Sequence, residues 1–248
     1  MGRRIIPVVV AVLSASLAQA QVTNTSPSDL AGFRGLILTP AGAFPQLFLP
    51  NVRTERPYRA TLALRFGQYK YADFEGSRRN VGVTGSVALN RRLRAGATAG
   101  RHSGPTDGDR AYLYSADVEA SIYHKPARNM TGGDTDIGML FSAGYGKPDS
   151  GNAAARSVWM SIPVAVTLPQ QKAALSIFVA PSMGYGQLEV DGVSDGSVRP
   201  MFGAGATWAF DMGLAAHLTV HRIIVNESPT QIGFGASYTF GGGPPRSE

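Results

Sequence analysis

Apolar and polar residues alternate along most of this chain, in segments of about ten to thirteen residues between Tyr58 and Phe240. The last segment shows the pattern most clearly: Ile232, Phe234, Ala236, Tyr238 and Phe240 alternate with Gly233, Gly235, Ser237 and Thr239. A period of two is the signature of a β-strand with one apolar face. Ten such segments follow one another, so the pattern predicts ten strands.

The predicted strands are spread over the whole of this region. They begin near Tyr58, Val81, Leu93, Tyr112, Ile137, Val158, Leu175, Phe202, Leu214 and Ile232. Proline has no amide hydrogen to donate to a sheet, so we expect local irregularities at Pro163, Pro181 and Pro200. Pro163 falls inside the sixth predicted strand, which otherwise alternates from Val158 to Leu168.

The connections between the predicted strands alternate in length. If the first strand runs upward, the outer connections fall at 73–80, 102–110, 147–156, 189–197 and 226–230. The inner connections fall at 90–92, 169–172 and 211–213, and at 124–134 as the one long exception. Short periplasmic turns and longer outer loops are typical of bacterial transmembrane barrels, and an even number of strands returns the chain to its starting side.

Charged residues inside the strands all share the polar face. They are Arg65, Arg94, Asp117, Glu119 and Asp136. A basic residue facing lipid near the bilayer midplane costs about 2–4 kcal/mol. This distribution therefore predicts that the apolar face meets lipid and that the polar face lines a lumen.

Aromatic residues gather near the expected ends of the strands, as in the girdles of membrane barrels. The inner group is Tyr58, Tyr123, Trp208, Phe210, Tyr238 and Phe240, and the outer group is Tyr112, Tyr114, Tyr145, Tyr185 and Phe202. Strict alternation nevertheless puts Tyr123 on the lumen side, together with Trp159.

Together these patterns predict an all-β fold: an antiparallel transmembrane β-barrel of about ten strands, with eight or twelve as alternatives. A soluble lipid-carrying barrel is the rival fold, because alternation alone does not say which face points inward. Charged residues make up only 16% of the chain, against about a quarter in typical soluble domains. The sparse charge, the aromatic girdles and the alternating loops favour the membrane barrel.

The N-terminal part of the chain does not share the alternation. Residues 1–20 resemble a secretory signal peptide, because Arg3 and Arg4 precede an apolar stretch that ends in the small-residue site Ala18-Gln19-Ala20. Residues 21–57 are expected to form a periplasmic extension or a plug, since three prolines would disrupt a sheet there. An irregular pair of strands is the alternative. The barrel then spans 58–240, and 241–248 form a flexible tail.

The last predicted strand, Gly233-Phe234-Gly235-Ala236-Ser237-Tyr238-Thr239-Phe240, resembles the closing strand of small outer-membrane β-barrel proteins. In that family of eight- to ten-stranded barrels, alternating aromatics that end in Phe are read by the barrel-assembly machinery. The resemblance implies export to the cell outer membrane of a Gram-negative bacterium. This chain departs from the family pattern because eight residues follow Phe240.

The polar face offers few candidates for chemistry. His217 and His221 lie on the ninth predicted strand, far around a ten-strand ring from the carboxylates of the fourth and fifth, so no catalytic residue is assigned. Zinc needs three or four converging ligands, which no spacing here provides, and no cofactor is expected. Instead, a lumen polar network is predicted from Arg65, Arg94, Asp117, Glu119, Asp136 and His217.

Charge gives little support to a nucleic-acid partner. The formal net charge of +6 becomes +4 without the two arginines of the predicted signal, and the basic residues are scattered. Expected partners are outer-membrane lipid and lipopolysaccharide, whose phosphates suit the guanidinium groups of Arg78, Arg79, Arg110 and Arg156. Ordinary solvation of the outer loops is the alternative explanation of these four arginines. We expect a monomer with a structural or interaction role and no enzyme activity. The alternatives are a narrow pore for small solutes and an outer-membrane enzyme acting on lipid or peptide.

Overall fold

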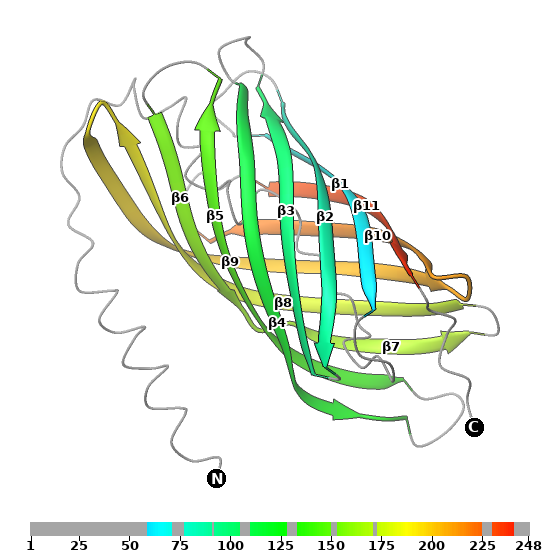
Figure 1. Cartoon of the computed structure of the whole chain (residues 1–248). Helices are drawn as coiled ribbons and strands as arrows, with labels where there is room; N and C mark the ends of the chain where they lie inside the picture. The colour runs from blue at the N-terminus through cyan, green and yellow to red at the C-terminus, as the bar shows by residue number, and fades with distance from the viewer. Residues whose placement is uncertain are drawn as a thin grey trace, which may run out of the picture.

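A computed structural model describes eight segments of the chain, and the regular elements in them are all strands (Figure 1). The described segments are 59–70, 77–90, 92–104, 110–127, 133–149, 153–170, 173–224 and 230–240. The predicted signal peptide, the extension at 21–57, Tyr58 and the tail at 241–248 lie outside them. No helix in the described segments is long and apolar enough to cross a membrane.

The strands form one continuous antiparallel sheet. They are β1 (Ala60–Lys70), β2 (Arg78–Asn90), β3 (Leu93–Ser103), β4 (Arg110–Lys125), β5 (Asp134–Pro148), β6 (Ala153–Ser161), β7 (Val164–Gln170), β8 (Ala173–Val190), β9 (Val193–Phe210), β10 (Leu214–Ile223) and β11 (Thr230–Thr239). Strands that follow one another in the chain pair with each other, except β6 with β7, and β1 pairs with β11. The sheet therefore closes into a barrel, which leaves no unpaired edge.

Two of the strands, β6 and β7, together make one stave of the wall. Both pair with β5 on one side and with β8 on the other. They are separated at Ile162 and Pro163, where the ladder is interrupted as the proline predicts. The amide of Ile162 still donates to the carbonyl of Pro181, and the Pro163 carbonyl accepts from Gly138. The ten-strand antiparallel barrel is thus confirmed, with one stave in two parts.

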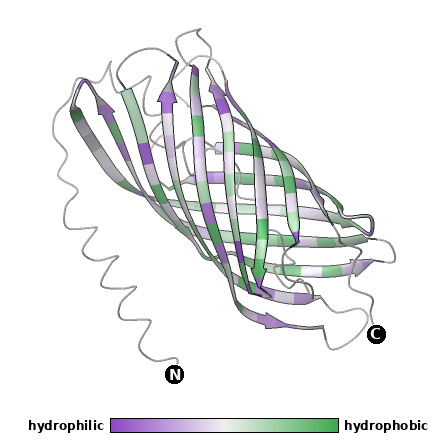
Figure 2. Cartoon of the chain, in the orientation of Figure 1, coloured by the Kyte–Doolittle hydropathy of each residue, from purple (hydrophilic) through white to green (hydrophobic). Residues whose placement is uncertain are grey.

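The apolar face of every stave points out of the barrel. Leu62, Leu64 and Phe66 of β1 are exposed, whereas Ala63 between them is buried. Figure 2 shows the same alternation of hydrophobic and hydrophilic positions along the other strands. A soluble carrier would have its apolar face inside, so that rival fold is wrong. In the described strands, no charged residue faces outward between the two aromatic girdles.

The aromatic girdles have the predicted members, wherever the structure describes them. The outward-facing inner group is Tyr123, Trp208, Phe210, Tyr238 and Phe240, and the outer group is Tyr112, Tyr114, Tyr145, Tyr185 and Phe202. The lumen-side phase expected for Tyr123 is wrong, because the register with β5 shifts between Ser121 and Tyr123. This β-bulge turns Tyr123 outward and His124 inward. Trp159 faces inward as its phase predicts.

The connections identify the two ends of the barrel. β1 begins and β11 ends at the same end, beside the short connections β2–β3, β7–β8 and β9–β10. We take this as the periplasmic end. The outer connection expected at 189–197 is wrong: β8 and β9, each 18 residues long, continue to a tight turn at Asp191 and Gly192. Since about 9–11 residues span a bilayer, strands of this length are long enough for the hairpin to extend beyond the outer girdle.

Candidate functional site

The lumen contains an ion pair between neighbouring staves. Arg94 of β3 and Glu119 of β4 are register partners, and their side chains form a salt bridge that is almost fully buried. Asp117 is the next inward residue along β4. Its carboxylate lies over Gly96, in the space that a Cβ atom would need, so the glycine makes room for the acid.

Arg65 and His217 complete this charged region from other parts of the wall. Arg65 of β1 interacts electrostatically with Asp117, Glu119 and Arg94. His217 of β10 interacts electrostatically with Arg65 and Arg94. Five of the six residues of the predicted lumen network are therefore brought together. The sixth, Asp136, lies apart near the periplasmic end, where its carboxylate is 2.7 Å from Nδ1 of His124.

His217 also connects three staves through hydrogen bonds to hydroxyl groups. Its Nδ1 lies 3.0 Å from Oγ1 of Thr207 on β9, and its Nε2 lies 2.9 Å from Oγ of Ser237 on β11. A serine nucleophile activated by histidine needs an orienting acid on the second ring nitrogen, and Thr207 occupies that position here. His217 and Ser237 are both only 4% exposed, so a substrate has no access to them.

Large inward side chains fill the space left by glycine on the next stave. Trp159 of β6 lies over Gly184 of β8, and Phe178 of β8 lies over Gly205 of β9. Both aromatic residues are 2% exposed. Elsewhere on the inner wall, side-chain hydroxyl groups of neighbouring strands form hydrogen bonds. Oγ1 of Thr84 lies 2.7 Å from Oγ1 of Thr98, and Oγ1 of Thr167 lies 2.8 Å from Oγ of Ser176. The inner wall is therefore packed like a protein core.

Sequence reasoning did not find two inward pairs. One joins Nδ1 of His102 to Oδ1 of Asn80 at 2.7 Å, and the other is His124 with Asp136. The predicted outer connections 73–80 and 102–110 include Asn80 and His102, so the first pair was not expected. His124 falls in the predicted inner connection 124–134, and its inward direction depends on the bulge. The described residues contain no cluster of metal-ligating side chains.

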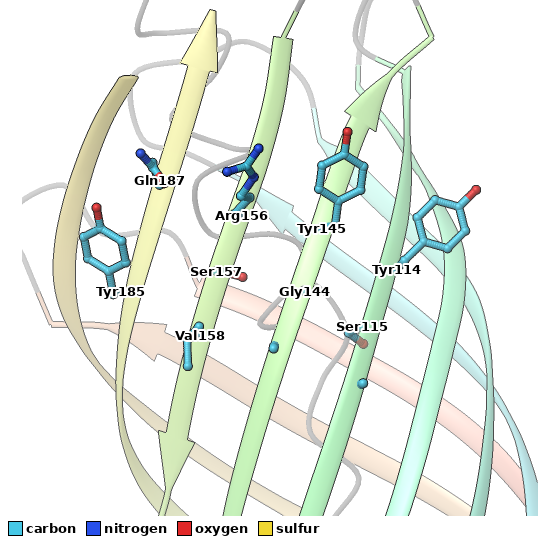
Figure 3. A pocket seen from close by; sticks show the side chains of 11 residues that line it. Tyr114, Ser115, Gly144, Tyr145, Arg156, Ser157, Val158, Tyr185 and Gln187 are labelled. Carbon is cyan, nitrogen blue, oxygen red and sulfur yellow. The ribbon is translucent and has the colours of Figure 1, made fainter. Parts of the chain in front are cut away.

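A hollow lies on the outside of the wall, and its position was also not predicted. It has a volume of about 680 Å3 and lies over β4, β5, β6 and β8 (Figure 3). Its upper row consists of the register partners Tyr114, Tyr145, Arg156 and Gln187. The row below consists of Ala116, Ala143, Val158 and Tyr185. The small side chains of Ala116 and Ala143 leave the space between the larger residues.

The lipid-compatible exterior, the two girdles and the closed sheet are the features of a bacterial membrane barrel. The fold is that of a small outer-membrane β-barrel. No protein-family model matches the sequence, and a search of the curated proteins found no match.

Solved structures with a similar barrel were found at low sequence identity. LpxR from Salmonella typhimurium is 11% identical over 85% of this chain and 96% of its own, with a TM-score of 0.43. Ail, the attachment invasion locus protein of Yersinia pestis, is 9% identical over 75% and 100%, with a TM-score of 0.30. The N-terminal β-barrel domain of Pseudomonas aeruginosa OprF is 12% identical over 73% and 97%, with a TM-score of 0.32. Likeness at this level assigns no activity to this chain.

Proposed function

We propose that this outer-membrane barrel has a structural or interaction role and that its lumen is closed to solutes. The observation that carries the proposal is the burial of inward side chains around the ring. Thr84, Thr98, Glu119, Trp159, Phe178, Thr207, Thr219 and Ser237 are each at most 4% exposed. Side chains that line an open water channel would be accessible to solvent. Barrels with few staves have interiors just wide enough for their side chains, which agrees with this burial.

The proposal excludes catalysis. Ser237 and His217 lack an acid in the orienting position and are buried. The His124–Asp136 pair has no nucleophile among its described contacts. Inward pairs such as Thr84 with Thr98 and His217 with Ser237 are better explained as contacts that hold neighbouring staves together, since buried polar groups need partners.

The proposed function also includes a monomeric state and insertion by the barrel-assembly machinery. The pairing of β1 with β11 leaves no free strand edge, and free edges are what draw a second chain to a sheet. The closing strand β11 presents Phe234 and Tyr238 outward and is followed by the exposed Phe240, which is the aromatic pattern that the resemblance to outer-membrane proteins implies. Interaction with other molecules would then use the outer end, where the β8–β9 hairpin extends beyond the girdle.

The test is conductance of the refolded full-length protein in a planar lipid bilayer. We expect no discrete conductance steps, while a shift in gel mobility between boiled and unboiled samples verifies that the barrel is folded. Regular steps from folded protein would contradict the closed lumen and favour the narrow pore. Turnover of lipid A or peptide that is lost in His217→Asn would contradict the absence of catalysis.

A further inference from the structure

The outward residues at the outer strand ends are mainly basic. They are Arg79, Arg101, Arg110, Lys147, Arg156 and Arg222, and the acidic residues among them are Asp149 and Glu189. Asp149 pairs with Arg101 at 2.7 Å, and Glu189 lies 3.6 Å from Arg156. Among the described outward residues of these strand ends, basic residues therefore outnumber acidic ones just above the outer aromatic girdle. That is the level at which the headgroups of the outer leaflet meet the barrel.

Arg156 connects this basic ring to the exterior hollow. Its side chain is 62% exposed, and it lies between Tyr145 and Gln187 in the upper row. Lys147 is the next outward residue after Tyr145, so it is a diagonal neighbour of Arg156, with roughly 7–8 Å between such positions. Two cations at this spacing suit a phosphate group, and the planar guanidinium can bind it through two hydrogen bonds.

The hollow itself combines an apolar floor with polar tips. Ala116, Ala143 and Val158 provide a surface for a hydrocarbon chain. Figure 3 shows the polar ends of Tyr114, Tyr145, Arg156 and Gln187 all directed toward the outer end of the strands.

The width of the polar row distinguishes between kinds of lipid. The row crosses four staves, and neighbouring strands are about 4.8 Å apart, so it extends over roughly 14 Å. This is wider than the single phosphate group of a phospholipid. It suits a headgroup made of more than one sugar, with phosphate at one end and hydroxyl groups facing the tyrosines and Gln187.

We propose that this hollow binds a phosphorylated glycolipid of the lipid A type, with an acyl chain on Ala116, Ala143 and Val158 and a phosphate on Arg156 and Lys147. The inference rests on the proposed function only in requiring a barrel in the outer membrane. It specifies the class of molecule with which the barrel interacts and the place on its outer wall where that molecule binds.

The experiment measures lipid retained by the full-length barrel, refolded in detergent with bisphosphorylated lipid A and examined by native mass spectrometry. We expect one lipid A per barrel, with affinity lowered roughly tenfold or more in Arg156→Gln, because a charge-assisted contact is lost. Ala143→Phe fills the floor and should lower affinity without changing charge. The matched controls are Arg222→Gln and Ala216→Phe, outward residues on β10, which should bind as the native protein does.

The proposal would be overturned if the native barrel retained no lipid A, or if it formed a dimer without lipid. It would also be overturned if Arg156→Gln bound lipid A as tightly as the native protein does. A third contradiction would be native protein that binds phosphatidylglycerol or dephosphorylated lipid A as tightly as it binds lipid A. The gel-mobility shift of each variant verifies folding. Conductance measured on the same preparation separates the two proposals. An open channel would contradict the proposed closed lumen and leave the lipid result intact, whereas lost lipid selectivity in a silent barrel would contradict this inference alone.

Discussion

At the scale of single residues, Glu119 is the most fully buried acidic residue in the part of the chain that the structure describes. Its side chain is 1% exposed, and the salt bridge with Arg94 balances its charge. One of its oxygens, Oε1, has no hydrogen-bond partner among the described atoms. The cost of burying the two charges is high, so their pairing is weak evidence for net stabilisation. Removing one partner, however, leaves the other charge buried and uncompensated.

We therefore predict that Glu119→Ala lowers the free energy of unfolding by about 3–5 kcal/mol. Urea titration of the barrel in lipid vesicles, followed by tryptophan fluorescence, measures the change. Replacing both partners, as Arg94→Met with Glu119→Leu, should recover most of the loss. Glu189→Gln is the control, because its pair with Arg156 is exposed at the rim and worth about 0–1 kcal/mol. A loss in Glu119→Ala no larger than in this control would show that the buried pair has little influence.

At the scale of elements, the β8–β9 hairpin extends outside the membrane and depends on its turn. Asp191 and Gly192 have φ values of 49° and 83°, both in the left-handed region. Two positive φ values characterise the type I′ turn, which matches the twist of the two strands and favours the Asp-Gly sequence. The tight turn replaces the longer loop that the alternation of loop lengths had predicted.

Gly192→Ala should destabilise the end of this hairpin by about 1 kcal/mol, because a side chain is disfavoured at positive φ. Hydrogen exchange of the amides near the turn should become about fivefold faster, while the urea midpoint of the whole barrel changes little. Gly85→Ala is the matched control, since an added Cβ there meets nothing within 4 Å and its φ is not positive. Equal exchange in native protein and Gly192→Ala would contradict the importance of the turn geometry.

At the scale of the whole molecule, the apolar exterior requires lipid around it. The outward side chains of the belt, such as Val83 at 47% and Leu218 at 47%, remain about half exposed in the isolated barrel. A contiguous apolar surface of this kind marks a membrane contact. Inside, several polar residues pair across neighbouring staves, such as Thr84 with Thr98 and Thr167 with Ser176.

We predict that Val83→Arg, in the middle of the belt, lowers stability in lipid vesicles by about 2–4 kcal/mol. Thr230→Arg at the outer rim should cost about 0–1 kcal/mol, because the membrane penalty falls near the interface. Both are measured by urea titration of vesicle-inserted protein. If Val83→Arg were as mild as the rim variant, lipid would not surround this face, and the protein would behave as a soluble barrel.

The differences between sequence and structure have identifiable causes. The ten staves, their exposed residues and the girdles followed from alternation, because a side chain's direction in a strand depends only on its position. Tyr123 was misassigned since a bulge inserts one residue and reverses that direction. The Asp191-Gly192 turn could have been predicted, because Asp-Gly between two alternating segments is typical of a tight hairpin turn. The exterior hollow had no such signal, since Tyr114, Tyr145, Arg156 and Gln187 belong to four different strands, and only the register between those strands aligns them.

The sequence by itself determined which residues share a face, where the strands lie and that charge is kept away from the apolar face. These are local properties, set by the two-residue repeat of a strand. The charge distribution and the aromatic girdles also predicted that the apolar face meets lipid. Only the tertiary structure decided which acid pairs with which base and which side chains form the hollow. Those facts depend on the closure of β1 onto β11 and on the register between strands, and neither is contained in the periodicity of any one strand.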